Sequence, residues 1–109
     1  MRSLVIYRSI SGFTKKYAEW IAQELKAEIH DAKNFDVALF SNYDIVIFGG
    51  SLHAVGINGI KIVKQNLPIL KNKKIIVFCV GASPPRENIL KEVKNNNFNA
   101  EQQQNIAFY

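Results

Sequence analysis

The sequence predicts an α/β domain, a doubly wound parallel sheet with helices on both faces, and two observations carry this prediction. Three apolar runs rich in β-branched residues are continuous rather than alternating, which indicates strands buried on both faces; they are Leu4–Tyr7, Ile45–Phe48 and Ile75–Val80. Segments with helical periodicity lie between these runs. The alternation along 109 residues fits one domain, spanning residues 1–109.

The segment after the first strand predicts a helix and then two weaker elements. Between Thr14 and Lys26, apolar residues recur with the helical period, and together they predict one buried stripe: Tyr17, Ala18, Ile21, Ala22 and Leu25. Ala27–His30 predicts a second strand from a weaker pattern, and Asp36–Phe40 predicts a short helix.

The second half continues the alternation. A helix is expected over Gly59–Leu67, ended by Pro68. Another helix is expected from Arg86 to about Asn95, and the polar stretch Asn95–Gln104 predicts a linker with little core content. Asn105–Tyr109 begins a new apolar run, which predicts the start of a fifth strand.

The charge balance excludes some classes of function and leaves others open. Lys and Arg total 14 against 9 Asp and Glu, and residues 55–109 carry the whole excess of +5. A solvated lysine surface is the simplest explanation, and an anionic partner is the alternative. No basic stripe is interleaved with aromatic residues, so nucleic-acid binding is not expected. No apolar run approaches the roughly 18 residues of a membrane span, while peripheral contact with an anionic membrane stays open.

The cysteine count and the N-terminus favour a reducing cytoplasm. One cysteine forms no internal disulfide, and it excludes a zinc module built on cysteine pairs. The first ten residues carry arginine within their apolar stretch and lack a cleavage site, so they do not resemble a signal peptide. Cys79 lies inside an apolar run and is interpreted as a small core residue.

The connection between the first strand and the first helix carries the strongest site signal. Ser9–Thr14, with the sequence SISGFT, brings three hydroxyls and a glycine to a helix N-terminus, whose unpaired amides and dipole attract an anion. Gly12 permits a close approach of the backbone to the guest. The segment predicts a phosphate site, although Ser11 as a simple helix cap is an open alternative. The GxxxxGK[ST] and GxGxxG patterns are both absent.

These residues resemble the flavodoxins. Ser9–Thr14 matches their [ST]-x-[ST]-G-x-T phosphate loop, Tyr43–Ser51 resembles their third strand and the loop after it, and Ile75–Ser83 resembles their fourth strand and the next flavin loop. The resemblance covers nearly the whole chain and implies a three-layer α/β/α sandwich with strand order 2-1-3-4-5. Gly50–Gly56 is more similar to flavodoxin-domain proteins of the protoporphyrinogen-dehydrogenase type than to short-chain electron carriers.

The resemblance implies FMN as the cofactor. Its phosphate would bind to Ser9–Thr14, and its isoalloxazine would lie between the loops Ser51–Asn58 and Gly81–Arg86. The implied cofactor-binding residues are Ser9, Ile10, Ser11, Gly12, Phe13, Thr14, Ser51, Leu52, His53, Ala54, Val55, Gly56, Gly81, Ala82, Ser83 and Pro84. No catalytic residue is implied, and the sequence has no set of metal ligands with suitable spacing.

Two departures from the flavodoxins concern the flavin itself. The two flavin loops lack the Trp and Tyr that stack on the ring in many flavodoxins. They also hold no Asp or Glu before Glu87, while His53 and Arg86 are present. Negative charge on the reduced flavin is therefore opposed less, and we expect a two-electron potential less negative than that of a flavodoxin with acidic loops.

Four single residues have alternative interpretations. His53 either donates a hydrogen bond to a flavin carbonyl, accepts a proton from a substrate, or faces water. His30 is interpreted as structural or solvated, and Trp20 as a packing residue rather than a stacking partner of the flavin. Arg86 is most simply a residue at the start of a helix, with contact to a substrate carboxylate as the alternative.

The resemblance implies electron transfer, with a redox partner protein or a quinone- or porphyrin-type small molecule as the partner. One alternative is an FMN-dependent oxidoreductase of the protoporphyrinogen or quinone dehydrogenase type. An alternative of another class is an interaction domain that kept the fold without the cofactor. The family fold continues with a complete fifth strand and a last helix after the position of Tyr109, so the chain is expected to be truncated at its C-terminus.

Overall fold

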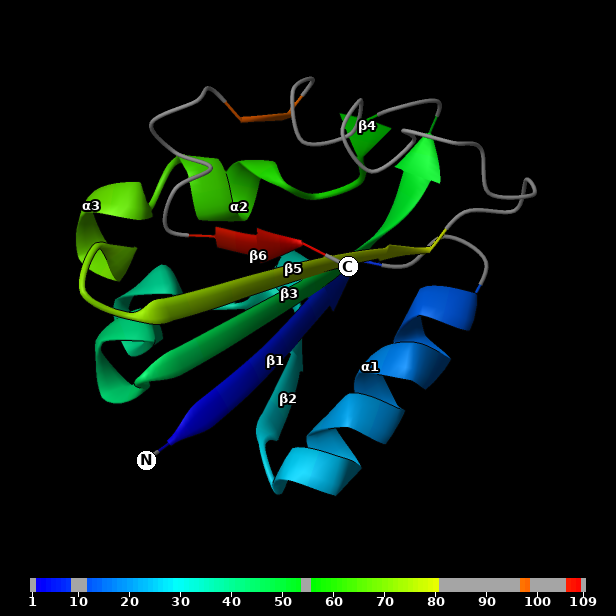
Figure 1. Ribbon diagram of the computed structural model, residues 1–109, viewed down its shortest axis with the longest axis horizontal. Helices are drawn as coiled ribbons and strands as arrows, with labels where there is room; N and C mark the ends of the chain where they lie inside the picture. The colour runs from blue at the N-terminus through cyan, green and yellow to red at the C-terminus, as the bar shows by residue number, and fades with distance from the viewer. Residues whose placement is uncertain (1, 9–11, 54–55, 81–96, 99–105, 109) are drawn as a thin grey trace.

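The structure is a computed structural model, and it confirms the doubly wound parallel sheet (Figure 1). It describes residues 2–8, 12–53, 56–80, 97–98 and 106–108. The strand order is β2-β1-β3-β5-β6, with β4 paired antiparallel to β3. The elements are β1 (Ser3–Arg8), α1 (Phe13–Leu25), β2 (Glu28–Asp31), the 3-10 helices η1 (Ala32–Asn34) and η2 (Val37–Asn42), β3 (Ile45–His53), β4 (Gly56–Ile57), α2 (Lys61–Lys64), α3 (Leu67–Leu70), β5 (Lys74–Val80) and β6 (Ile106–Phe108).

The central strands form where the continuous apolar runs predicted them. Val5 of β1 pairs in register with Ile29 of β2 and Ile47 of β3, and Ile47 pairs in turn with Ile76 of β5. The last apolar run forms β6, which pairs parallel to β5, so the expected fifth strand is confirmed. β5 and β6 occupy the fourth and fifth places of the predicted order 2-1-3-4-5.

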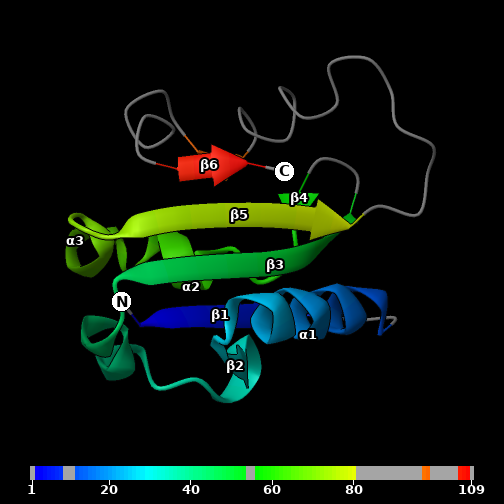
Figure 2. The same ribbon diagram turned by 60° about the horizontal axis from the view of Figure 1, so that its bottom comes forward.

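Alternate residues of β1 point to opposite faces of the sheet and belong to two separate apolar core layers. Leu4 and Ile6 of β1 belong to the layer that includes Val63 of α2 and Leu70 of α3. Val5 belongs to the other layer, together with small residues of α1. Figure 2 shows α1 on one side of the sheet and α2 and α3 on the other. The sheet is therefore buried on both faces, as the continuous runs require.

The buried stripe of α1 differs from the predicted one. Thr14, Ala18 and Ala22 are buried, whereas Tyr17 and Leu25 are 47% and 53% exposed. The small side chains let the helix lie close to the strands, and this close contact sets the rotation of the helix. Tyr17 then lies about 100° around the axis from Ala18 and turns away from the sheet.

The predicted helix over Gly59–Leu67 is wrong in its extent, and so is the role of Pro68. α2 ends at Lys64. Two residues later, Asn66 Nδ2 donates a hydrogen bond to the carbonyl oxygen of Ile62 at 2.7 Å. Pro68 lies in the first turn of α3. A helix tolerates proline there because the amides of its first turn have no acceptor within the helix. The proline therefore begins the next helix rather than ending the previous one.

The polar linker expected over Asn95–Gln104 contributes to the core, which corrects that prediction. Phe98 is 3% exposed and belongs to the layer containing α2 and α3. The buried side chain of Asn97 accepts a hydrogen bond from the amide of Ile57 at 3.2 Å. Both residues therefore anchor the connection between β5 and β6. The helix predicted over 86–95 lies outside the described residues.

An ion pair lies at the amino edge of the sheet, where β1 and β2 begin. Arg2 Nη2 donates to Glu28 Oε2 at 2.7 Å, and the Arg2 guanidinium lies over the Tyr43 ring at 4.9 Å. The hydrogen bond from Arg2 is the main cause of the lowered pKa of Glu28. Both partners are more than half exposed, so the pair fixes geometry and adds little stability.

Replacing Phe98 with alanine should lower the free energy of unfolding by about 3–4 kcal/mol, because truncating a buried ring leaves a cavity in a packed layer. Urea denaturation followed by circular dichroism measures the loss. The matched control is Ile69→Ala, a truncation at an exposed position of α3 that should cost less than about 1 kcal/mol. Equal unfolding midpoints for Phe98→Ala and the unchanged protein would contradict the core role of Phe98.

Candidate functional site

Three connections leave the sheet side by side at its carboxyl edge. The register pairs Arg8, the last residue of β1, with Gly50 of β3, and it pairs Ser51 of β3 with Val80, the last residue of β5. The segments that follow β1, β3 and β5 therefore begin from neighbouring positions. In an open parallel sheet, ligands bind beyond this edge, at the point where the strand order reverses.

The N-terminus of α1 lies at this edge, and the first amides of the helix have no acceptor within the helix itself. Gly12 precedes the helix with φ 90°, a left-handed conformation that glycine adopts without strain. The amide of Lys16 donates to the Gly12 carbonyl at 3.2 Å, so the amides of Phe13, Thr14 and Lys15 have no acceptor within the helix. A Cβ built on Gly12 would meet nothing within 4 Å. A ligand can therefore approach this backbone closely.

Thr14 has a buried hydroxyl that lacks a hydrogen-bond partner among the described residues. The residue itself is fully buried. A buried hydroxyl without a partner costs about 1–3 kcal/mol. An anionic oxygen bound at the first turn of α1 would supply an acceptor for this hydroxyl as well as for the amides.

The charges of the first turn also favour an anion. No acidic residue lies in the first turn of α1, and Lys15 and Lys16 follow directly. The positive end of the helix dipole favours acidic neighbours, and two lysines there are unfavourable in isolation. A doubly charged phosphate group would balance both the dipole and the lysines.

The connection after β3 forms a hairpin that is tightly held to the sheet. Leu52 pairs with Ile57 and His53 with Gly56. Asn58 closes the hairpin twice, because its amide donates to the Ser51 carbonyl and its Nδ2 donates to Ser51 Oγ, each at 2.9 Å.

Gly50 allows the hairpin to fold back closely onto the backbone of β3. A Cβ built there would lie 2.5 Å from the carbonyl oxygen of Asn58. Sequence reasoning placed Asn58 only at the end of the loop and missed its closing role. The role of Asn97, which accepts from the Ile57 amide, was also missed, because a stretch of Asn and Gln gives no signal for one buried member.

The structure describes part of the predicted cofactor site. Gly12 precedes α1, and Phe13 and Thr14 form its first turn, with Phe13 exposed and Thr14 buried. Leu52, in the first strand of the hairpin, packs against the core layer of α2 and α3. Ser51 and His53 end β3, and Gly56 begins β4. The remaining predicted residues lie outside the described part: Ser9, Ile10, Ser11, Ala54, Val55, Gly81, Ala82, Ser83 and Pro84, and Arg86 also lies there.

Three single residues can be compared with their interpretations. Cys79 packs partly buried against the core, and this burial raises the pKa of its thiol, which agrees with a core residue rather than a nucleophile. His30 is exposed with its ring edge-on to Phe35 at 5.5 Å, which agrees with a structural or solvated residue. The interpretation of Trp20 as a packing residue is wrong, because Trp20 is 68% exposed.

No cluster of three His, Cys, Asp or Glu side chains suited to a metal ion occurs among the described residues. No helix in this part of the chain is long and apolar enough to cross a bilayer.

Residues 4–108 match the Flavodoxin domain family, and the chain belongs to this family. It is 40% identical over 91 residues to the flavodoxin-like domain-containing protein BilS of Clostridioides difficile, covering 76% of this chain and 49% of that protein. It is 33% identical over 96 residues to a flavodoxin of Maridesulfovibrio salexigens, covering 75% of this chain and 64% of that protein. The chain thus spans less than two thirds of the length of either relative.

The fold is shared with solved flavoproteins. A crystal structure of a flavoprotein in complex with FMN from Lactobacillus acidophilus NCFM superimposes with a TM-score of 0.64 and 19% identity, covering 98% of this chain and 89% of that one. These comparisons establish the family and the fold. They do not reach the protoporphyrinogen-dehydrogenase type, which stays a prediction.

In the protein without ligand, Thr14→Val should raise the free energy of unfolding by up to about 1 kcal/mol, because a methyl group replaces a buried hydroxyl that lacks a partner. Thr14→Ser keeps the hydroxyl and loses a methyl group, so it should destabilise by about 1 kcal/mol. Urea denaturation of both variants measures the difference. A destabilised Thr14→Val would mean that the hydroxyl already has an acceptor in solution.

Proposed function

We propose that this chain binds FMN at the carboxyl edge of the sheet and serves in electron transfer. The observation that carries the proposal is the buried Thr14 hydroxyl, which has no partner among the described residues, next to amides at the N-terminus of α1 that have no acceptor within the helix. Membership of the Flavodoxin domain family supports it, as does the fold shared with a flavoprotein in complex with FMN.

The phosphate end of FMN fits the residues present. The amides of Phe13, Thr14 and Lys15 and the Thr14 hydroxyl would donate to phosphate oxygens. The space beside Gly12 is open, because a Cβ built there would meet nothing within 4 Å. Ser9 and Ser11 of the predicted phosphate loop would add donors. Charge-assisted hydrogen bonds contribute about 1.5–3 kcal/mol each, so this set binds a doubly charged group without a lysine contact.

The hairpin after β3 would position the flavin end. Its two hydrogen bonds between Asn58 and Ser51, and the bond from the Ile57 amide to Asn97, hold it rigidly at the edge of the sheet. Gly56 leaves the hairpin without a side chain at the predicted approach to the ring. FMN, when bound, supplies the electron-carrying chemistry, and the chain binds and orients it.

Fluorescence quenching of FMN and of riboflavin tests the phosphate site, because riboflavin lacks the phosphate. Thr14→Val should weaken FMN binding by about tenfold to a hundredfold, the loss expected for one hydrogen bond to a charged group. Its riboflavin affinity should stay unchanged. The matched control is Ser41→Ala, which removes a hydroxyl that donates to the Ala38 carbonyl on η2. Unchanged FMN affinity in Thr14→Val and Ser11→Ala would refute the proposed phosphate site.

The two-electron potential of bound FMN should be less negative than that of a flavodoxin with acidic flavin loops. The physical reason is the lack of Asp and Glu in Ser51–Asn58 and Gly81–Arg86, which reduces repulsion of the negative charge gained on reduction. A redox titration with reference dyes measures the potential. The variant Ala54→Asp adds a carboxylate to the loop Ser51–Asn58 and keeps the bonds between Asn58 and Ser51, and it should make the potential more negative. An equally low potential in the unchanged protein would contradict this prediction.

A further inference from the structure

Ser51 lies on the same face of the sheet as α1, at the carboxyl edge. It pairs in register with Val80 of β5, which packs against the core layer of α1, and paired residues of neighbouring strands point to one face. Leu52, the next residue, belongs to the opposite layer, as the alternation of a strand requires. Gly50 pairs with Arg8, the last residue of β1, so Ser51 lies one position beyond the end of that strand.

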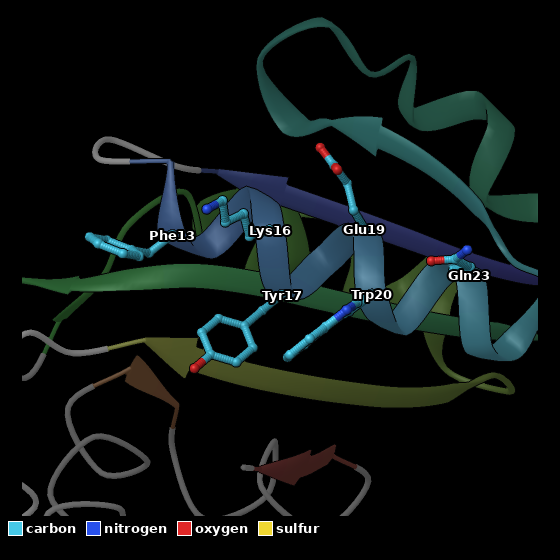
Figure 3. A pocket seen from close by; sticks show the side chains of 6 residues that line it. All are labelled: Phe13, Lys16, Tyr17, Glu19, Trp20 and Gln23. Atoms are coloured by element: carbon cyan, nitrogen blue, oxygen red, sulfur yellow. The ribbon is translucent and has the colours of Figure 1, made fainter.

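The first turn of α1 brings a second hydroxyl to this face and this edge. Thr14 is fully buried, and its Oγ1 has no hydrogen-bond partner among the described residues. Phe13, by contrast, is 61% exposed, and Figure 3 shows its side chain projecting outward from the start of the helix. The turn therefore offers a ligand its backbone amides and the Thr14 hydroxyl. Ser51 ends β3, which is the strand beside β1, and β1 leads into this turn.

Asn58 determines how the Ser51 hydroxyl can act. Asn58 Nδ2 donates to Ser51 Oγ at 2.9 Å, and the Asn58 amide donates to the Ser51 carbonyl at the same distance. A hydroxyl has one proton to donate and two lone pairs that accept. The bond from Asn58 occupies a lone pair, so it leaves the Ser51 proton to donate elsewhere. The described residues provide no acceptor for that proton.

The hairpin fixes the backbone from which the Asn58 side chain extends. Leu52 pairs with Ile57, directly before Asn58, and the Ile57 amide donates to the buried side chain of Asn97 at 3.2 Å. Gly50 makes room for this backbone, because a Cβ there would lie 2.5 Å from the Asn58 carbonyl oxygen. An asparagine side chain has only two rotatable bonds, so a fixed backbone and one hydrogen bond hold its amide in place.

We propose that Asn58 is a positioning residue, which holds the Ser51 hydroxyl as a hydrogen-bond donor to the phosphate group bound at the first turn of α1. The inference rests on the proposed function, because it concerns the phosphate end of the same cofactor. A phosphate dianion only accepts hydrogen bonds, so it matches a hydroxyl whose lone pair is occupied and whose proton is available. The substitution Asn58→Asp would accept the Ser51 proton instead, and the hydroxyl could then offer an anion only lone pairs.

Titrations of the whole chain with FMN and with riboflavin test this contact. Ser51→Ala should weaken FMN binding by about tenfold to a hundredfold, the loss expected for one hydrogen bond to a charged group, and leave riboflavin affinity unchanged. Asn58→Ala should weaken FMN binding by about threefold to tenfold, because the freed hydroxyl rotates and donates to the phosphate only part of the time. The matched control is Asn66→Ala, which removes an amide that donates to the Ile62 carbonyl and should leave both affinities unchanged.

Asn58→Asp tests the direction of the hydrogen bond, because it keeps the size of the side chain and replaces the donor with an acceptor. It should weaken FMN binding more than Asn58→Ala does, and part of this loss comes from the added charge alone. The same substitution in a Ser51→Ala background carries the charge without the hydroxyl. We expect the loss caused by Asn58→Asp to be at least about fivefold smaller in that background, because no hydroxyl remains to be redirected.

Two spectroscopic measurements report on the hydrogen bonds themselves. In the protein without ligand, Ser51→Ala should shift the nuclear magnetic resonance signals of the Asn58 side-chain amide, because that amide loses its acceptor. In the FMN complex, Asn58→Ala should raise the pKa of the bound phosphate, followed through its phosphorus resonance, because a dianion with a weaker donor is stabilised less. Asn66→Ala should change neither signal.

Three results would overturn the inference alone. The first is an FMN affinity that falls in Thr14→Val but not in Ser51→Ala, which would keep the phosphate site and remove Ser51 from it. The second is an equal loss of FMN and riboflavin affinity in Asn58→Ala, which would make Asn58 a purely structural residue of the hairpin. The third is an equal loss from Asn58→Asp with and without the Ser51 hydroxyl. An FMN affinity unchanged in Thr14→Val as well as in Ser51→Ala would instead refute the proposed function, and the inference with it.

Discussion

The parallel pairing of β1 with β3 is the constraint from which the rest of the architecture follows. After β1 the chain forms β2 on one side of β1, and it then crosses to form β3 on the other side. The direction in which strands are added therefore reverses between β1 and β3. The connections after β1 and β3 consequently leave toward opposite faces of the sheet. In open parallel sheets, ligands bind beyond the carboxyl edge at such a reversal, and here the N-terminus of α1 and the β3–β4 hairpin both lie at that edge.

The central strands and the start of the first helix were predictable because local signals specify them. A strand buried on both faces must be apolar throughout, and Ile45–Phe48 and Ile75–Val80 have no other simple explanation. The SISGFT segment combines a turn residue, hydroxyls and a helix start within six positions. The helix begins at Phe13, close to the expected start, whereas the burial of the Thr14 hydroxyl without a partner among the described residues depends on the packing of the helix against the sheet.

The wrong predictions share a physical cause, which is that tertiary contacts outweighed a local pattern. Pro68 was expected to end a helix, yet the first turn of a new helix accommodates proline equally well. Phe98 was hidden in a polar stretch, since one buried ring does not change local composition. The rotation of α1 was set by the small residues Ala18 and Ala22, and periodicity alone could not distinguish them from the aromatic side chains of the neighbouring stripe.

The hydrogen bond from the Ile57 amide to Asn97 joins two regions that lie forty residues apart. Because this bond is buried, separating the regions would leave a polar atom unsatisfied on each side. The hairpin and Asn97 are therefore expected to open together, and the Ile57 amide should exchange with solvent deuterium as slowly as its neighbours in the hairpin. Any ligand that stabilises the hairpin would therefore also hold Asn97 in place, so its effect on exchange would reach a residue that is forty positions away in the sequence.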